Sequence, residues 1–326
     1  MKVCVTGGAG YIGAVIVSQL LQQGFEVVVY DKCLFGGESL LAYKSPQFRL
    51  VPGDIRDRDL LQSTLCDVDV VVHLAALVGE EACSLDSEMT QVINLTGAEQ
   101  VLTLAEESGV KRFIFISTCS NYGVSSAEAL ADEKSPLNPL TVYAETKVAI
   151  EKKILESSYS MKTTIFRFGT ICGLSPRMRF DLLVNDMARA VALDLPLQIY
   201  SPEAYRPFLH VQDAAGAVIH CLSAEEKLID KQVFNVISEN YQKAELMQLV
   251  QKHFPEKEIE IVKKDADLRD YRVSAEQIKT IIGFSPSFTV EQAFLETVNA
   301  VKGNVFRNPL WSGHSSVPES IETITC

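Results

Sequence analysis

The sequence has no long apolar run and no cluster of basic residues, and these absences exclude whole classes of protein. Apolar stretches such as residues 70–77 are far shorter than the ~18 residues that a membrane-spanning helix needs. A glycine cluster at 7–10 interrupts the amino-terminal region, where a signal peptide would have a continuous apolar segment. We therefore expect a cytoplasmic protein that does not bind a membrane.

Charge and cysteine usage exclude two further classes. The 42 acidic and 30 basic side chains give a net charge of −12, and no local cluster of lysine and arginine offsets it, so binding to nucleic acid is disfavoured. No two of the eight cysteines lie within three residues of each other. This spacing excludes the usual zinc and redox motifs, so we expect no metal site and no disulfide framework.

The first half of the chain has the periodicity of an α/β protein. Its 326 residues fit one large domain or two adjoining ones. In the first 170 residues, short β-branched runs alternate with stretches of helical spacing, and we expect strands at 2–6, 26–30, 48–51, 68–74, 112–117 and 163–168. Strands that are apolar on both faces and alternate with helices predict a doubly wound parallel sheet, whose ligands bind at the carboxyl ends of the strands.

Beyond residue 170 the alternation is less regular and predicts a smaller mixed α/β domain. We expect helices at 180–193, 213–222, 243–252 and 275–282, strands at 232–237 and 258–262, and a loop across Pro196, Pro202 and Pro207. These patterns divide the chain into a Rossmann-type domain at 1–170, a second domain at 171–302 with strands that can rejoin the main sheet, and a loosely held tail at 303–326.

The first expected strand leads directly into Gly7-Gly8-Ala9-Gly10-Tyr11-Ile12-Gly13 and then into an apolar helix. These glycines fit the fingerprint of a dinucleotide-binding loop, in which the bare backbone approaches a pyrophosphate and amides at the helix start donate to it. Asp31, at the end of the next strand, can accept from both ribose hydroxyls and would repel a 2′-phosphate, which predicts NAD rather than NADP. The alternative is a glycine-rich turn without a ligand.

Tyr143 and Lys147 form the first catalytic candidate. They are spaced i, i+4 in a segment with helical character, so the phenol and the ammonium share one helix face. A tyrosine has a pKa near 10, and a nearby cation lowers that pKa because it favours the phenolate. The pair could therefore act as a base near neutral pH. The alternative is a surface Tyr/Lys pair on an amphipathic helix, which is commoner for this spacing alone.

A stretch of hydroxyl-bearing residues, Ser117-Thr118-Cys119-Ser120-Asn121-Tyr122-Gly123, follows the strand expected at 112–117. It lies at the edge where a doubly wound sheet binds its ligands. A hydroxyl there could share the proton of a substrate hydroxyl with Tyr143. An ordinary loop at the end of a strand is also rich in Ser and Asn. This stretch therefore indicates a catalytic site only together with the glycine loop and the Tyr143/Lys147 pair.

Together the three motifs make the sequence similar to the extended short-chain dehydrogenase/reductase family, in particular to its NAD-dependent nucleotide-sugar epimerases and dehydratases. The resemblance covers roughly residues 1–300 and implies NAD as cofactor and a nucleotide-diphosphate sugar as substrate. Three more motifs carry it: Gly53-Asp54-Ile55, His73-Leu74-Ala75-Ala76 and Arg206-Pro207-Phe208-Leu209-His210-Val211-Gln212-Asp213.

The resemblance also implies which residues bind the cofactor. Asp54 and Ile55 match contacts to the adenine, and Asn94 matches a helix residue that helps to orient Lys147. The full set of implied cofactor contacts is Gly7, Gly10, Tyr11, Ile12, Gly13, Asp31, Asp54, Ile55, Leu74, Ala75, Ala76, Asn94, Tyr143 and Lys147. Thr118 takes the position of the catalytic Ser/Thr, which gives Thr118, Tyr143 and Lys147 as the catalytic residues.

The residues after Thr118 distinguish the branches of the family. The 4,6-dehydratases have an Asp and a Glu there, enzymes that decarboxylate a nucleotide-linked glucuronic acid have a Glu at the position of Ser120, and 3,5-epimerases have a Cys at that position. This chain has Cys119 one residue early, and we interpret it as a packed residue. The remaining set of Thr118, Tyr143, Lys147 and NAD suffices for a 4-epimerase, which oxidises C4 and returns the hydride to its other face.

Two other functions stay open. A nucleotide-4-keto-sugar reductase, or another sugar-nucleotide dehydrogenase or dehydratase, would use the same residues, although Asp31 disfavours the reductase because many cellular reductions draw on NADPH. A non-catalytic dinucleotide sensor with this fold typically loses the tyrosine or the lysine, and this chain keeps both.

Four arginines in the second half are candidates for binding the diphosphate of the substrate, because a guanidinium fork matches paired oxygens. They are Arg177, Arg179, Arg206 and Arg269. Arg206 lies in a motif of the family, whereas the other three fit solvated surface arginines equally well.

The resemblance also implies a homodimer. Members of the family commonly pair the helix that corresponds to 89–107 with the helix that carries Tyr143. Apolar residues in 89–107 suit such an interface, and core packing explains them equally well.

Overall fold

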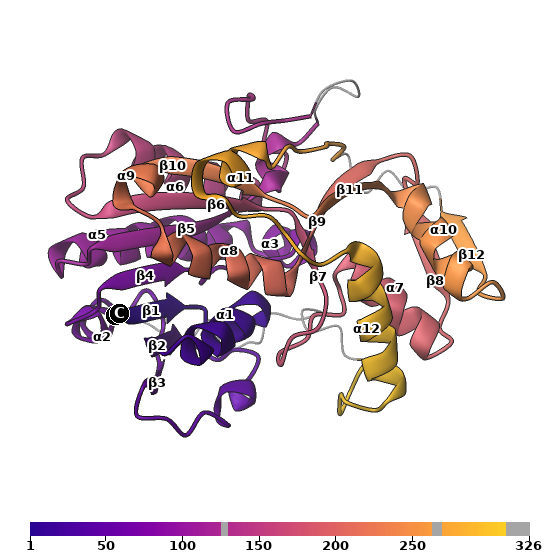
Figure 1. Cartoon of the computed structure of the whole chain (residues 1–326), viewed down its shortest axis with the longest axis horizontal. Coiled ribbons are helices and arrows are strands. Elements are labelled where there is room, and N and C mark those ends of the chain that lie inside the picture. The colour runs from indigo at the N-terminus through magenta and orange to yellow at the C-terminus, as the bar shows by residue number, and fades with distance from the viewer. Residues whose placement is uncertain (125–129, 263–268, 311–326) are drawn as a thin grey trace.

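Seven parallel strands form the main sheet, in the order β10-β6-β5-β4-β1-β2-β3 (Figure 1). The computed structural model describes residues 1–124, 130–262 and 269–310, so the expected tail lies outside the described residues from 311 onward. The seven strands are β1 (Lys2–Thr6), β2 (Glu26–Asp31), β3 (Phe48–Pro52), β4 (Val70–His73), β5 (Arg112–Thr118), β6 (Lys162–Phe168) and β10 (Gln232–Val236). This confirms the doubly wound parallel sheet, and β10 comes from the second half of the chain to pair with β6.

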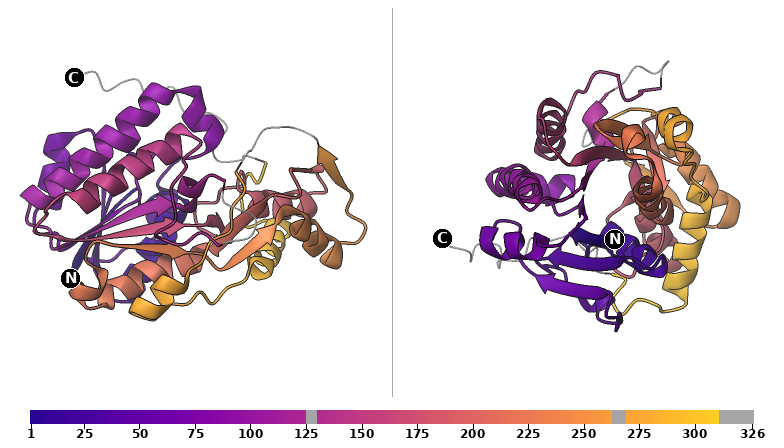
Figure 2. Two further views of the ribbon diagram at one scale, coloured as in Figure 1. Left: turned by 90° about the horizontal axis from the view of Figure 1, so that it is seen from above. Right: turned by 60° about the vertical axis from the view of Figure 1, so that its left-hand side comes forward.

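Helices cover both faces of this sheet (Figure 2). On one face lie α1 (Tyr11–Gln22) and α8 (Val211–Ser223); on the other lie α2 (Arg58–Leu65), α5 (Ala98–Glu107) and α6 (Val142–Glu156). The side chains of β1 alternate between the two faces of the sheet. Val3 and Val5 pack on the α1 side, and Cys4 packs on the α5 side. None of the helices within the described ranges has the length and apolar character needed to cross a membrane.

The region that the sequence analysis treated as one helix, 89–107, is interrupted. It contains α4 (Ser87–Gln91), a π-helical segment Val92–Gly97 and α5, and the short helix α3 (Glu80–Leu85) precedes them. Gly97 ends the π-helical segment where the helix passes Ile55, and a Cβ atom on Gly97 would lie 2.8 Å from the Ile55 side chain. Such segments are frequent at functional sites.

The second half of the chain builds a smaller lobe beside the carboxyl ends of the strands (Figure 1). A three-stranded sheet has the order β11-β9-β7, and β8 pairs with β12. These strands are β7 (Thr170–Cys172), β8 (Leu197–Tyr200), β9 (Tyr205–His210), β11 (Glu239–Gln242) and β12 (Ile259–Val262). The helices of this half, besides α8, are α7 (Leu183–Ala192), α9 (Glu226–Ile229), α10 (Lys243–His253), α11 (Glu276–Ile282) and α12 (Val290–Lys302).

The expected loop across Pro196, Pro202 and Pro207 is wrong, because β8 and β9 occupy most of it. Pro207 lies within β9 opposite Asn240 of β11. A proline removes one backbone donor from a strand, but the neighbouring Phe208 is completely buried, so packing outweighs the missing hydrogen bond. The sequence analysis also missed α12, and the helix expected at 180–193 begins only at Leu183.

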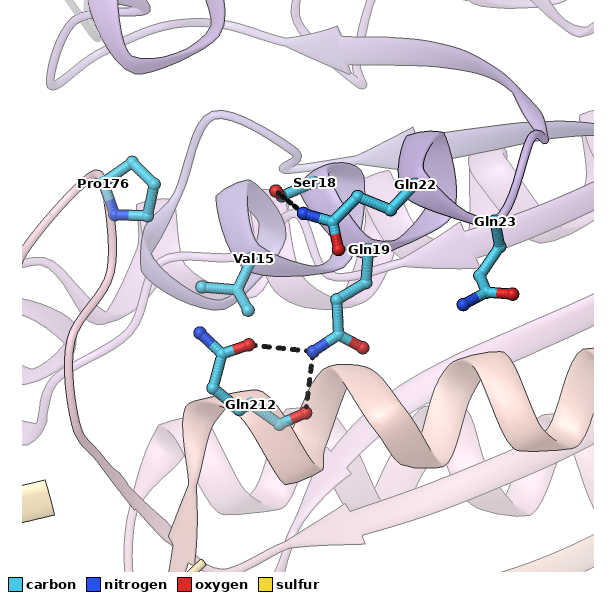
Figure 3. A pocket seen from close by; sticks show the side chains of 7 residues that line it. All are labelled: Val15, Ser18, Gln19, Gln22, Gln23, Pro176 and Gln212. Carbon is cyan, nitrogen blue, oxygen red and sulfur yellow. Dashed lines mark hydrogen bonds between the residues drawn. The ribbon is translucent and has the colours of Figure 1, made fainter. Parts of the chain in front are cut away.

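A pair of glutamines joins the two helices that cover one face of the sheet (Figure 3). The side-chain amide of Gln19 in α1 donates to the backbone carbonyl of Gln212 in α8 at 3.1 Å and to its side-chain oxygen at 2.9 Å. A hollow of about 260 Å³ beside the pair is lined by Val15, Ser18, Gln19, Gln22, Gln23, Pro176 and Gln212. The contact fixes α1, which begins at the glycine loop, against α8.

Candidate active site

A cavity of about 850 Å³ lies at the carboxyl ends of the parallel strands and extends to the smaller lobe. Its volume is typical of sites for small molecules and cofactors. Every site residue expected from the sequence lines it except Asn94. The expected residues that line it are Gly7, Gly10, Tyr11, Ile12, Gly13, Asp31, Asp54, Ile55, Leu74, Ala75, Ala76, Thr118, Tyr143, Lys147, Arg177, Arg179, Arg206 and Arg269.

The glycine loop has the tight geometry that its sequence predicts. Gly7 has φ +75°, and a Cβ atom there would lie 2.7 Å from the backbone nitrogen of Ala75. The backbone of Gly10 donates to the carbonyl oxygen of Gly7, and α1 begins immediately afterwards. Gly13 packs the first turn of α1 directly onto the loop. A helix start without side chains suits the binding of a pyrophosphate.

Gly13→Ala is expected to remove dinucleotide binding. The added Cβ would lie 2.2 Å from the Gly7 carbonyl oxygen and 2.6 Å from the Gly8 Cα, so the loop has to move, at a cost of about 1–3 kcal/mol in stability. Thermal melts and the NAD content of the purified protein measure both effects. Gly216→Ala in α8 is the matched control, because its Cβ meets only Phe284 at 3.5 Å and its melting temperature should not fall. An alanine at 13 with full NAD content would contradict the prediction.

Asp31 lies at the end of β2, beside the glycine loop. Its two carboxylate oxygens accept hydrogen bonds from the backbone amides of Ala9 at 2.9 Å and Cys33 at 2.7 Å. Burial raises the pKa of this carboxyl group, while the two amides oppose the shift. Each oxygen keeps accepting capacity toward the cavity, so Asp31 fits the role of a ribose ligand.

Asp31→Asn is expected to weaken NAD binding and to reduce the preference for NAD over NADP by about tenfold, because one charge no longer repels a 2′-phosphate. Titration of the NAD-free protein with each dinucleotide measures the ratio. Asp59→Asn, at an exposed position in α2, should leave the ratio unchanged. If the wild-type protein bound NADP more tightly than NAD, this role of Asp31 would be wrong.

Asp54 lies at the same end of the cavity in a cluster of charges. Its carboxylate contacts the guanidinium of Arg56 at 2.8 Å and the ammonium of Lys32 at 3.1 Å. Burial alone would raise the pKa of Asp54, but hydrogen bonds from Arg56 and Lys32 outweigh it and lower the pKa to about 2. Asp54 is therefore ionised and held in place at the position expected for an adenine contact.

Tyr143 and Lys147 lie in the first two turns of α6 and face the cavity together. The ammonium of Lys147 donates to the carbonyl oxygen of Ile116 at 2.8 Å, and it lies 5.8 Å from the centre of the Tyr143 ring and 4.8 Å from that of Phe115. Burial lowers the pKa of Lys147 to about 8. Lys147 is thus mostly protonated at neutral pH, and its charge favours the phenolate of Tyr143.

Thr118 ends β5 and faces the same part of the cavity. Its hydroxyl oxygen accepts from the amide of Ser120 at 3.1 Å and caps the short turn Cys119–Tyr122. Cys119 points away from the cavity: it is completely buried and its thiol donates to the carbonyl oxygen of Arg167. Burial raises the pKa of that thiol and favours its neutral form, which fits a packed residue.

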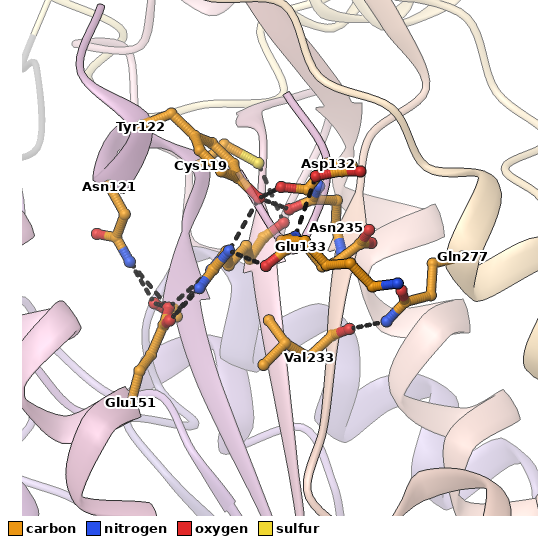
Figure 4. A network of polar contacts seen from close by, with 12 residues as sticks. Cys119, Asn121, Tyr122, Asp132, Glu133, Glu151, Val233, Asn235 and Gln277 are labelled. Atoms are coloured by element: carbon orange, nitrogen blue, oxygen red, sulfur yellow. Dashed lines mark hydrogen bonds and ion pairs between the residues drawn. The ribbon is translucent and has the colours of Figure 1, made fainter. Parts of the chain in front are cut away.

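A buried ion pair between Arg167 and Glu151 connects α6 to β6 of the main sheet (Figure 4). Arg167 of β6 donates to Glu151 at 2.6 Å, and their side chains are only 4% and 2% exposed. Glu151 also accepts from the hydroxyl of Ser117 at 2.5 Å and from the amide of Asn121 at 2.8 Å. The pair therefore connects the helix that carries Tyr143 and Lys147 to the strand that ends in Thr118.

Asn94 is bonded to the backbone at Leu77. Its side-chain oxygen accepts from the amide of Leu77 at 2.7 Å, and its side-chain nitrogen donates to the carbonyl oxygen of Leu77 at 2.9 Å. Among the described residues it makes no direct hydrogen bond to Lys147, which is held by Ile116. Asn94 instead fixes the backbone at Leu77, which lines the cavity.

The four candidate arginines occupy different parts of the cavity. Arg206 and Arg269 lie together, since a guanidinium nitrogen of Arg206 donates to the carbonyl oxygen of Arg269. Arg179 pairs with Asp181. Arg177 lies on the cofactor side, with its guanidinium 4.5 Å from the centre of the Phe35 ring. Burial raises the pKa of Asp31, and the charge of Arg177 opposes that rise.

The loop that carries Arg177 and Arg179 is bonded to the glycine loop through Tyr11. The Tyr11 hydroxyl donates to the carbonyl oxygen of Gly173 at 2.5 Å and accepts from the side chain of Asn185 at 3.0 Å. Ser175 donates to the carbonyl oxygen of Tyr11 at 2.7 Å. A residue of the dinucleotide fingerprint thus connects the two halves of the chain.

Three residues at the far end of the cavity were not found from the sequence. Gln198 and Tyr200 of β8 and Lys243 of α10 line it, and the ammonium of Lys243 donates to the carbonyl oxygen of Tyr200 at 3.1 Å. Gln198 and Tyr200 were missed because they fall in the loop that was wrongly expected across Pro196–Pro207. An alternation of apolar and polar residues at 197–200 was the signal that could have identified the strand.

Comparison with known proteins identifies the family. The model of the NAD dependent epimerase/dehydratase family matches residues 3–236, and the chain belongs to this family, as its motifs had indicated. A UDP-glucose 4-epimerase of Halalkalibacterium halodurans is 27% identical over 350 residues, covering 99% of this chain and 98% of that protein. A probable UDP-glucuronate 4-epimerase of Rhizobium meliloti is 29% identical over 247 residues, covering 70% of this chain and 71% of that protein.

Solved structures agree with this assignment. The UDP-glucose 4-epimerase of Thermus thermophilus, solved in complex with NAD, has a TM-score of 0.80 and 26% identity, covering 93% of this chain and 100% of that one. The UDP-glucuronic acid 4-epimerase of Bacillus cereus shares the fold, with a TM-score of 0.84 and 24% identity over 93% of this chain and 99% of that one. NAD is therefore the cofactor, and the bare glycine loop and Asp31 fit it.

Proposed function

We propose that the protein is an NAD-dependent nucleotide-sugar 4-epimerase. The observation that carries this proposal is that Tyr143, Lys147 and Thr118 face one cavity together with the glycine loop and Asp31. Relatives named as UDP-glucose 4-epimerases span nearly the whole chain and support it. The short turn after Thr118 has no carboxylate, so it lacks the acid and base that the elimination of water requires.

Three side chains, those of Tyr143, Thr118 and Lys147, act on the proton of the C4 hydroxyl. When bound, NAD supplies a reversible hydride acceptor. Tyr143 as phenolate takes the proton of the C4 hydroxyl, Thr118 holds that hydroxyl by a hydrogen bond, and Lys147 stabilises the phenolate with its charge. The same phenol returns the proton once the other face of C4 is turned toward the cofactor, so the base is restored in each cycle.

Incubation of the purified protein with UDP-glucose, and with the dTDP-, GDP- and CDP-linked hexoses, tests the proposal. We expect conversion to the C4 epimer with no added cofactor and no net change in absorbance at 340 nm. Conversion that consumes added reduced cofactor in proportion to product would establish a 4-keto-sugar reductase instead. Tight NAD binding without conversion of any nucleotide sugar would favour a non-catalytic sensor.

We also infer a homodimer. Leu85 and Val92 are large apolar side chains exposed by 79% and 36%, and both lie in the stretch of short helices next to α6. Exposed apolar side chains of this kind suit an interface. Light scattering should give twice the mass of the chain, and Leu85→Glu should shift the protein toward the monomer. A monomeric wild-type protein at micromolar concentration would rule the dimer out.

We infer a cytoplasmic location from the thiols. None of the seven cysteines within the described residues is in a disulfide, as expected for a protein of a reducing compartment. Fractionation of cells that express a tagged protein tests this, and recovery from a secreted or membrane fraction would contradict it.

A further inference from the structure

The loop between β7 and α7, residues 173–182, borders the cofactor side of the cavity. Arg177, Arg179 and Asp181 of this loop line the cavity. The guanidinium of Arg177 lies over the ring of Phe35, which follows Asp31 in the loop after β2. The loop 173–182 thus forms one wall of the part of the cavity in which Asp31 and the glycine loop bind NAD.

One buried side chain, that of Asn185 in α7, holds this loop at two points. Its side-chain oxygen accepts from the amide of Gly173 at 3.0 Å, and its side-chain nitrogen donates to the carbonyl oxygen of Arg179 at 2.9 Å. The same nitrogen donates to the hydroxyl oxygen of Tyr11 at 3.0 Å. Asn185 is completely buried, and both hydrogens of its amide group are in use, so its side chain has one fixed orientation.

Tyr11 bonds the loop 173–182 to the glycine loop at two points. Its hydroxyl donates to the carbonyl oxygen of Gly173 at 2.5 Å, and its backbone carbonyl oxygen accepts from the hydroxyl of Ser175 at 2.7 Å. Burial raises the pKa of the Tyr11 phenol, so the hydroxyl keeps the proton that it donates. Tyr11 is the first residue of α1, and these bonds therefore join the loop to the helix start that suits a pyrophosphate.

The beginning of the loop is also fixed to the second half of the chain. Gly173 has φ +100°, and a Cβ atom there would lie 2.6 Å from the Nε2 atom of His210. The amide of Leu174 donates to the carboxylate of Glu296 in α12 at 2.8 Å, and the same oxygen lies 2.9 Å from Nε2 of His210. Tyr11 therefore bonds the amino-terminal half to a segment that packing holds in place.

We propose that Tyr11 and Asn185 are positioning residues for the cofactor, which hold the loop 173–182 as a wall against bound NAD and thereby make the release of NAD slow. The hydroxyl of Tyr11 is the central atom, because it contacts both Gly173 and Asn185. Slow release suits a reaction that returns the hydride to the substrate from which it came, since the reduced cofactor must not leave in between. The inference concerns cofactor release and does not depend on the identity of the sugar.

Release of NAD from the loaded protein, measured without any sugar, tests the proposal. Protein loaded with radiolabelled NAD is mixed with excess unlabelled NAD and filtered at intervals, which gives the dissociation rate constant. We expect Tyr11→Phe to raise this rate constant by about tenfold or more, because the ring stays and the hydroxyl between its two partners is lost. Ser175→Ala removes the second bond to Tyr11 and should also raise it.

Tyr122→Phe is the matched control. The Tyr122 hydroxyl also lies between an asparagine and a backbone carbonyl, 2.7 Å from the side-chain oxygen of Asn235 and 2.9 Å from the carbonyl oxygen of Asp132. Its partners belong to the network around Arg167. Tyr122→Phe should therefore lower the melting temperature as Tyr11→Phe does and leave the rate of NAD release unchanged.

Two results would overturn the proposal. One is a Tyr11→Phe protein that releases NAD at the wild-type rate. The other is an equal acceleration in Tyr122→Phe, which would assign the effect to a general loss of stability. Neither measurement uses a nucleotide sugar, so a failure of the proposed 4-epimerase activity leaves this test intact.

Discussion

Replacing Tyr143 by phenylalanine is expected to lower kcat for C4 epimerisation by about 10²–10⁴-fold, the usual contribution of a positioned general base. The phenol is the group that accepts the proton. Without its hydroxyl the nearby ammonium of Lys147 has no phenolate to stabilise at position 143. The ring itself stays, so its packing against Leu77 and Cys83 is kept. Initial rates with a saturating nucleotide sugar measure the loss.

The control for this substitution is Tyr159→Phe, which removes a hydroxyl from a half-buried tyrosine just beyond α6. It should change kcat less than about twofold, as expected for a substitution away from the reacting atoms. Both variants should retain bound NAD and wild-type melting curves. A Tyr143→Phe protein that keeps a tenth or more of the wild-type kcat would show that another group is the base.

The second large effect is expected from Glu151→Gln, which should lower the free energy of unfolding by about 3–5 kcal/mol. The substitution leaves the Arg167 guanidinium charged and buried without its counter-charge, while a glutamine keeps the shape. In the wild-type protein burial lowers the pKa of Arg167, and the hydrogen bonds and charge of Glu151 outweigh it and raise that pKa. The variant loses this charge, but a guanidinium does not lose its proton in proteins, so Arg167 stays charged. Urea denaturation monitored by circular dichroism measures the change.

Glu156→Gln is the matched control on the same helix, since Glu156 is exposed at the end of α6, and its effect should be within about 0.5 kcal/mol. A double variant, Glu151→Gln with Arg167→Met, should recover part of the lost stability because the unpaired charge is removed. A single variant as stable as the wild type would show that the pair contributes nothing to the fold.

The sequence predicted the parts of the site that are local in the chain. The glycine loop lies within seven residues and Tyr143 and Lys147 within one helical turn, so the geometry of a turn or a helix is enough to bring their functional groups together. The six expected strands of the first half agree with the structure to within two residues at each end. Their continuous apolar runs reflect burial on both faces of a parallel sheet.

The parts that were missed depend on contacts between distant residues. Arg177 lies beside Phe35 only because the loop after β7 folds back across the amino-terminal half. Arg167 and Glu151 look like ordinary surface residues in the sequence, and their burial follows from the packing of α6 on β6. Pro207 predicted a loop because proline disfavours strands, but the burial of Phe208 outweighs that local preference.

The hydrogen bonds of Tyr11 bear on how the protein matures during synthesis. A nascent chain that has emerged only to residue 170 contains the whole glycine loop, yet it lacks Gly173, Ser175 and Asn185, the partners that fix Tyr11. It also lacks β10, the edge strand that pairs with β6. We therefore expect NAD to bind only after the second half of the chain has folded against the first. A ligand that binds only the folded form stabilises that form. NAD bound at that stage therefore stabilises the folded state of both halves of the chain.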